Sequence, residues 1–145
     1  GAHQTHVNGT DRSRAVACKE CHTVPKEILA AGHVDSARPA ELLFSGVAVA
    51  HGAEPSYENG TCQMTACHGA VFPDYPSGGS NTTPTWTSVD GSETTCGSCH
   101  GIPPPPPHVP AGNPCHDCHD DVADDDVTFT RPEEHVDGIV TLRFE

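Results

Sequence analysis

Eight cysteines fall into four close pairs, and a histidine directly follows the second cysteine of every pair. Two residues separate the cysteines of three pairs, and four residues separate those of the second pair along the chain. Two thiols at such a short separation can add to the two vinyl groups of one haem, and the adjacent imidazole can then bind the iron. The spacing therefore predicts four covalently bound haems c, the longer second motif being a rarer variant.

The predicted attachment residues follow directly from the motifs. The cysteines that would form thioether bonds are Cys18, Cys21, Cys62, Cys67, Cys96, Cys99, Cys115 and Cys118, and the proximal iron ligands would be His22, His68, His100 and His119. Structural zinc and disulfide bonds also use cysteine pairs, but neither has a reason to place a histidine after every pair. Only 11 of the 145 residues are histidine, and cysteines so near in sequence make awkward disulfide partners, so haem is the favoured interpretation.

Each iron has a second axial position, and the histidines outside the motif positions could fill it: His3, His6, His33, His51, His108, His116 and His135. The only methionine, Met64, lies inside the second motif and cannot easily reach around its own haem. Two histidines per iron are therefore expected, which gives low-spin iron with a lower potential than iron bound by histidine and methionine. Such an iron has no open position for a substrate.

Five of these histidines are candidates for the four distal positions. His116 lies within the fourth motif and cannot turn back to that iron, and His51 is expected at the surface on a turn. His3 and His6 would share one face if the N-terminus formed a helical turn. The candidates are therefore His3, His6, His33, His108 and His135, with His3 as the reserve.

The composition is that of a chain with too little apolar material for an ordinary core. Leu, Ile, Val and Phe number 24 of 145, against 14 glycines, 14 prolines and a formal charge of −13. Without cofactors this composition is typical of disorder. We therefore expect residues 1–145 to form a single, loop-rich domain, mostly irregular with short helices and a few short strands, organised around four haems.

Few elements are expected, and most are short. A turn or two of helix is expected near each cysteine pair, and irregular loop over 73–95. The apolar segment 41–50 could be a short strand or a packing loop. The five prolines at 103–107 favour an extended polyproline II spacer. The alternating pattern at 138–144 predicts a strand that could pair with another chain.

Charge and hydropathy exclude several kinds of partner. Seven scattered Lys and Arg residues give no basic patch, so a nucleic acid partner is not expected. No apolar run reaches transmembrane length, and Gly1 is typical of a mature N-terminus from which an export signal has been removed. An acidic cluster beside the fourth motif is most simply a solvated loop, with a divalent cation bridging it to a haem propionate as the alternative: Asp117, Asp120, Asp121, Asp124, Asp125 and Asp126.

The whole chain resembles the multihaem cytochromes of metal-reducing, Geobacter-like bacteria, which mix CxxxxCH and CxxCH motifs. The resemblance rests on the N-terminal His3 and His6, the order of the four motifs, and the segments His33-Val34-Asp35, His108 after the prolines, and His135-Val136-Asp137-Gly138. It implies distal ligation by His6 (or His3), His33, His108 and His135. It gives His51 no counterpart.

The resemblance also implies what the protein does. Members of this family are exported electron carriers, and some assemble into extracellular filaments, or nanowires, in which a neighbouring subunit supplies a distal histidine. The surplus histidine and the N-terminal pair fit such a subunit, which would be extracellular or at the cell surface. The alternatives are a monomeric tetrahaem shuttle in the periplasm or at the outer surface and, less favoured, a multihaem reductase. Expected partners are further copies of the chain, other redox proteins and extracellular electron acceptors.

Overall fold

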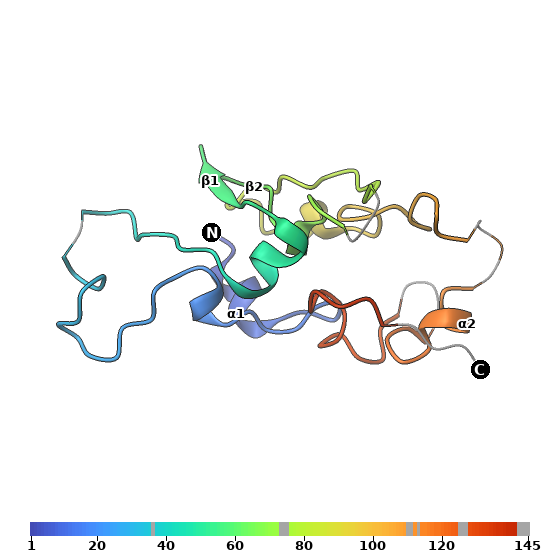
Figure 1. Ribbon diagram of the computed structural model, residues 1–145, viewed down its shortest axis with the longest axis horizontal. Coiled ribbons are helices and arrows are strands. Elements are labelled where there is room, and N and C mark those ends of the chain that lie inside the picture. The colour runs from blue at the N-terminus through green and yellow to red at the C-terminus, as the bar shows by residue number, and fades with distance from the viewer. Residues whose placement is uncertain (36, 73–75, 110–111, 113, 125–127, 142–145) are drawn as a thin grey trace.

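Most of the chain is irregular, as Figure 1 shows for this computed structural model, which describes residues 1–35, 37–72, 76–109, 112, 114–124 and 128–141. The α-helices are α1 (His3–Asn8) and α2 (His116–His119), and the strands are β1 (Ser56–Glu58) and β2 (Thr61–Gln63). Four 3-10 helices cover Cys18–Glu20, Gly46–Gly52, Ala66–His68 and Ser92–Thr94. The expectation of a mostly irregular, loop-rich fold with short helices and few strands is confirmed. No helix in these residues is long and apolar enough to cross a membrane.

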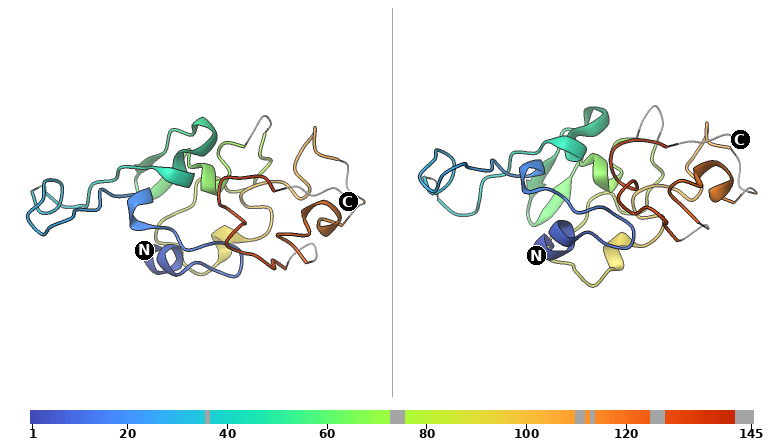
Figure 2. Two further views of the ribbon diagram at one scale, coloured as in Figure 1. Left: turned by 60° about the horizontal axis from the view of Figure 1, so that its bottom comes forward. Right: turned by 90° about the horizontal axis from the view of Figure 1, so that it is seen from below.

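The molecule is elongated, with a projecting loop at one end and α2 at the other (Figures 1 and 2). We call residues 23–43 the arm. Its base is closed by two backbone hydrogen bonds, in which Leu43 donates to the Cys21 carbonyl at 2.9 Å and Ser45 donates to the Glu20 carbonyl at 2.8 Å. The arm therefore leaves from, and returns to, the first cysteine motif.

Side chains alone provide little core. Among the described residues, the buried apolar side chains are Val47, Ala48, Ala53, Val122 and Ala123. Complete burial of a valine contributes about 1.5–3 kcal/mol, whereas ordering one residue's backbone costs about 1–2 kcal/mol, so five small side chains cannot offset the order of the whole chain. This agrees with a fold whose apolar centre comes from bound cofactors.

The two strands form an antiparallel hairpin in which Tyr57 pairs with Cys62. Asn59 and Gly60 connect the strands and both have positive φ, at 51° and 82°. Asn-Gly is the preferred pair for a two-residue turn with this handedness, because the turn matches the twist of the strands. Trp86 joins the hairpin by donating its backbone N–H to the Gly60 carbonyl at 2.7 Å. The hairpin thus fixes both Cys62 and Trp86.

Of three expected elements, the first below has its expected loop form and the other two differ from the structure. The segment 41–50 is a loop that runs into the 3-10 helix Gly46–Gly52, where the Glu20 carboxylate accepts the Val47 N–H at 3.2 Å. The prolines 103–107 form no continuous polyproline II spacer, because a turn brings the His108 N–H to the Pro105 carbonyl at 3.3 Å. The predicted strand at 138–144 is wrong for 138–141, which are irregular, and its remainder lies outside the described residues.

Candidate haem sites

Short helical turns shape three of the four cysteine motifs. In the first, the His22 N–H donates to the Cys18 carbonyl at 2.9 Å, and in the fourth, the His119 N–H donates to the Cys115 carbonyl at 3.0 Å. The second motif ends in the 3-10 helix Ala66–His68. The third follows Ser92–Thr94 closely. The expected turn near each cysteine pair is therefore present.

Each motif histidine faces one histidine from another part of the chain. The distances between ring centroids are 6.2 Å for His22 and His3, 6.1 Å for His68 and His6, 6.3 Å for His100 and His135, and 6.4 Å for His119 and His108. A metal–imidazole bond is about 2 Å long, so two imidazoles on opposite sides of one metal have centroids roughly 6 Å apart. All four pairs therefore fit an iron with two axial histidines.

Helix α1 supplies one histidine to each of the first two pairs. His3 and His6 lie one turn apart, and the His6 N–H donates to the Ala2 carbonyl at 3.1 Å. The helical turn that the spacing of these two residues suggested is present. Consequently a single short element reaches two motifs that are more than 40 residues apart in the sequence.

Hydrogen bonds orient most of these imidazoles. A backbone carbonyl can only accept, so a ring nitrogen bonded to it must carry the proton and the other nitrogen keeps its lone pair. This is the arrangement that metal-binding histidines use. The Nδ1 atom donates in this way in six of the eight paired residues: His6 to Ala2, His22 to Glu41, His100 to Gly101, His108 to Val109, His119 to Thr141 and His135 to Arg12.

Two of the paired histidines are held in the neutral form that binds metal. Burial lowers the pKa of His68 to about 4, and the neighbouring His6 acts in the same direction. Burial also lowers the pKa of His135 below its usual range. Both rings are therefore unprotonated at neutral pH and have a free lone pair.

The cysteines of the four motifs stand in pairs, without disulfide bonds. Burial raises the pKa of Cys21, Cys62 and Cys99, and that of Cys67 to about 12. Across the described residues, no group of three or more His, Cys, Asp or Glu side chains could hold a metal ion. The donor set suits thioether bonds and paired imidazoles.

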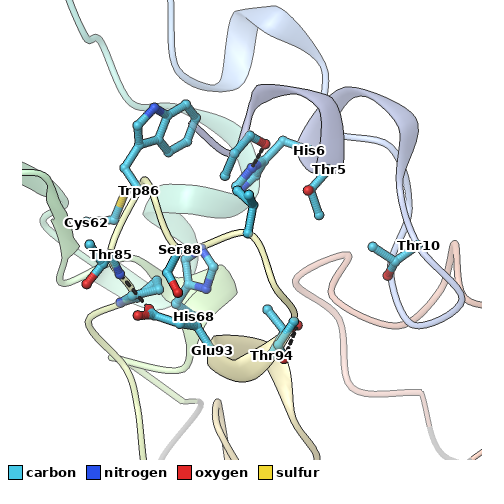
Figure 3. Close-up of a pocket in the computed structure, with 14 residues that line it drawn as sticks. Thr5, His6, Thr10, Cys62, His68, Thr85, Trp86, Ser88, Glu93 and Thr94 are labelled. Carbon is cyan, nitrogen blue, oxygen red and sulfur yellow. Dashed lines mark hydrogen bonds between the residues drawn. The ribbon is translucent and has the colours of Figure 1, made fainter.

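A cavity of about 190 Å³ lies at the second motif, and Figure 3 shows its lining. His6 and His68 both border it, together with Cys62 of the same motif and the indole of Trp86. Glu93 closes one side by accepting the Thr85 backbone N–H. A haem at this motif requires two imidazoles and two thiols, and both imidazoles and one of the thiols line this cavity.

Neighbouring sites are linked in order along the molecule. Trp86 contacts both His3 and His6, which belong to the first and second pairs. Gly69 lies so close to Cys99 of the third motif that a Cβ at Gly69 would overlap the Cys99 carbonyl. The fourth motif is in α2, at the end of the molecule opposite the arm (Figure 1). The first three sites are thus linked one after another and the fourth lies at the far end, and we call this arrangement the row of sites.

At the first site, the ring that faces His22 is that of His3, the expected reserve, and the choice of iron ligand stays a prediction. His33 lies on the exposed arm and borders a cavity of about 320 Å³ together with His3 and His22. Its Nδ1 donates to the Ile28 carbonyl at 2.7 Å, like the Nδ1 atoms of the paired rings. His33 is therefore oriented like a ligand but stands apart from the four pairs.

The remaining histidines and the acidic segment have other surroundings. His51 is exposed at the end of the 3-10 helix Gly46–Gly52, and His116 lies in α2 within 3.7 Å of the Asp117 carboxylate. Asp121 pairs with Arg131 at 3.1 Å, so the acidic segment is not purely solvated. Asp125 and Asp126 lie outside the described residues.

Sequence reasoning did not identify Trp86, which contacts His3 and His6, or Phe129, which contacts His135. The Phe129 ring stacks on His135 with centroids 4.1 Å apart. Trp86 is the only tryptophan in the chain, and that was the available signal. Phe129 carried no such signal, because no sequence motif connects it with a histidine.

The family described as the Geobacter CxxxxCH...CXXCH motif matches residues 61–100, which contain the second and third cysteine motifs. This match supports a multihaem c-type cytochrome of that kind. No curated protein and no solved structure matches the chain.

Proposed function

We propose that the chain is an exported electron carrier with four haems c, each iron bound by two histidines of the same chain. The observation that carries this proposal is the set of four imidazole pairs at 6.1–6.4 Å, one at each cysteine motif. The family match supports electron transfer by a multihaem cytochrome. The number of haems and the ligand pairs go beyond the family match and are our proposal.

The residues of the chain would perform two tasks. Each cysteine pair would hold its haem by two thioether bonds, and each histidine pair would fill both axial positions. The haem, when bound, supplies a one-electron redox couple. With both axial positions filled by imidazole, no substrate reaches the metal, so the protein passes electrons on and does not transform a substrate.

The row of sites gives the electrons a route. The first site adjoins the arm, the second shares Trp86 with it, the third touches the second at Gly69, and the fourth lies at α2. The formal charge of −13 favours the more positive oxidised iron. We therefore expect low reduction potentials and transfer between the two ends of the molecule.

Haem content tests this proposal. The intact mass of the purified protein should exceed that of the polypeptide by four haems. Replacing both cysteines of the second motif, Cys62→Ser with Cys67→Ser, should remove one haem and leave three. The matched control, Ser88→Ala at the same cavity, should retain all four. A wild-type mass with fewer than four haems would overturn the proposal.

A second candidate, end-to-end self-association into an extracellular filament, is favoured by the arm. Ile28, Leu29 and Val34 are 76%, 88% and 69% exposed, which is unusual for three large apolar side chains on one loop. His33 on the same arm has its Nδ1 bonded to Ile28 and no place among the four pairs. A second copy of the chain would cover the apolar surface and offer the end of another row of sites.

Electron microscopy and mass photometry distinguish the two assemblies. We expect filaments or end-to-end oligomers from the wild type, and monomers with four haems from Ile28→Asp with Leu29→Asp. Ile102→Asp, at an equally apolar position 51% exposed outside the arm, should leave assembly unchanged. A wild type that remains monomeric at every concentration would end the filament proposal and favour the monomeric shuttle, without affecting the haem count.

A further inference from the structure

Trp86 contacts two distal histidines at once. Its indole meets the edge of the His3 ring at right angles, with centroids 4.9 Å apart and an interplanar angle of 90°. The same indole stacks on His6, with centroids 5.4 Å apart and an angle of 29°. Figure 3 shows Trp86 beside His6 at the cavity of the second site. One side chain therefore touches the outer ligand of two neighbouring sites.

The backbone of Trp86 also holds the helix that carries both ligands. Its carbonyl accepts the Ala2 N–H at 2.9 Å, just before α1, and its own N–H is bonded to Gly60 in the hairpin turn. Gly1 packs so closely on the indole that a Cβ there would overlap the ring. Tyr57 lies against the indole at 6.5 Å, nearly perpendicular. The hairpin thus anchors Trp86, and Trp86 anchors the start of α1.

Helix α1 needs this support. It has six residues, none of them buried, and no side-chain cap at its N-terminus. A helix this short is unstable by itself, because the cost of nucleation is not recovered over so few hydrogen bonds. The directions of His3 and His6 therefore depend on contacts outside the helix, and the Trp86 ring is in contact with both.

The direction of an axial imidazole matters to the iron. When the two ligand planes are parallel, the iron d orbitals that bond to them split strongly, and when the planes are perpendicular, the orbitals become nearly equal in energy. The planes make an angle of 31° at the His3–His22 pair and 70° at the His6–His68 pair. Rotating either distal ring would change its contact with the indole.

We infer that Trp86 is a shared positioning residue, which sets the imidazole planes of His3 and His6 and thereby the electronic properties of the first two haems. The inference rests on the proposed four-haem function. Phe129 offers the contrast, because His135 is the one histidine of the described residues on which it stacks, at an interplanar angle of 17°. Trp86 should thus affect two haems, and Phe129 should affect one.

Electron paramagnetic resonance of the oxidised, haem-loaded protein tests this inference. In Trp86→Leu, two of the four low-spin signals should shift and two should stay, with four haems still bound. In Trp86→Phe, which keeps a smaller ring, the same two signals should shift by less. Phe129→Leu should shift one signal, and that signal should be one of the two that Trp86→Leu leaves unchanged. Redox titration should show the same division.

The outcomes separate this inference from the function on which it rests. Four low-spin signals in the wild type that none of the Trp86 variants changes would overturn the inference and leave the proposed function standing. A shift of all four signals would overturn it as well, because it would make Trp86 a general packing residue. If Trp86→Leu fails to bind haem, Trp86→Phe decides by the same criterion. Fewer than four low-spin signals in the wild type would count against the proposed function itself.

Discussion

The imidazole rings of His100 and His135 lie 6.3 Å apart between their centroids and almost perpendicular, at 83°. His135 is held there by the stacked ring of Phe129 and by the hydrogen bond from its Nδ1 to the Arg12 carbonyl. The Arg12 contact comes from a distant part of the sequence, and together the two contacts fix a histidine opposite the third motif. We therefore expect His135 to be the distal ligand of that haem.

Removal of His135 tests this ligand pair. In His135→Ala, one of four irons should lose its second imidazole, so about a quarter of the iron should become high-spin and bind carbon monoxide when reduced. Optical and paramagnetic resonance spectra measure both changes. His51→Ala, at an exposed ring outside the pairs, should change neither. An unaltered spectrum of the His135 variant would contradict the pairing.

The first site allows a direct choice between two ligands. His3 faces His22 at 6.2 Å, whereas His33 borders the same cavity from the arm. In the monomeric, haem-loaded protein, His3→Ala should convert about a quarter of the iron to the high-spin form, and His33→Ala should convert none. The reverse result, measured by the same spectra, would show that His33 is the ligand within the chain.

The four ligand pairs should not be spectroscopically alike. The rings of His108 and His119 are nearly parallel, at 11°, whereas those of His100 and His135 are nearly perpendicular. The oxidised wild type should therefore give at least two classes of low-spin signal, one rhombic and one with a single large g value. Four signals of one class would contradict these ring orientations.

Gly69 should be irreplaceable because two motifs meet there. Its φ is +75°, and a Cβ would overlap the Cys99 carbonyl. Gly60 has a similar φ of +82°, and a Cβ there would have nothing within 4 Å. Its substitution by alanine therefore measures only the cost of placing an L-residue at positive φ. Gly60→Ala should lower the free energy of unfolding by about 1–2 kcal/mol, and Gly69→Ala by clearly more. Denaturant titration of the haem-loaded variants measures this, and equal losses would contradict the close approach.

Glu20 should stabilise the first motif through its charge. It is buried, forms an ion pair with Arg14 at 2.7 Å, and accepts the Val47 N–H. Arg14 is about a quarter exposed, so we expect Glu20→Gln to cost about 2 kcal/mol, between the values for exposed and buried pairs. Glu134→Gln, in the more exposed pair with Arg131, should cost less than about 1 kcal/mol. Similar losses for both variants would contradict a special role for Glu20.

Local patterns in the sequence predicted the chemistry but not the pairing. The cysteine motifs and the scarcity of methionine predict haem and histidine ligands, and the low apolar content predicts the loop-rich fold, which the structure confirms. Which distal histidine faces which motif depends on contacts such as that between His135 and Arg12, which are 123 residues apart. No local pattern encodes such a contact, so the sequence does not show which of His3 and His33 serves the first motif.

Some structure could have been predicted but was not. Asn59-Gly60, followed by Thr61 and Cys62, carries the strongest short signal for a hairpin, and the structure has one there. The 3-10 helix at Gly46–Gly52 gave no such signal, because it depends on the carboxylate of Glu20, which is distant in sequence. The first omission concerns turn chemistry, and the second concerns tertiary contacts.

Anomalous scattering from iron, in crystals of the haem-loaded protein, tests the four histidine pairs most directly. We predict four iron peaks per chain, one between the two rings of each pair: His3 and His22, His6 and His68, His100 and His135, and His108 and His119. Fewer than four peaks, or an iron whose second ligand is not the paired histidine, would contradict the assignment.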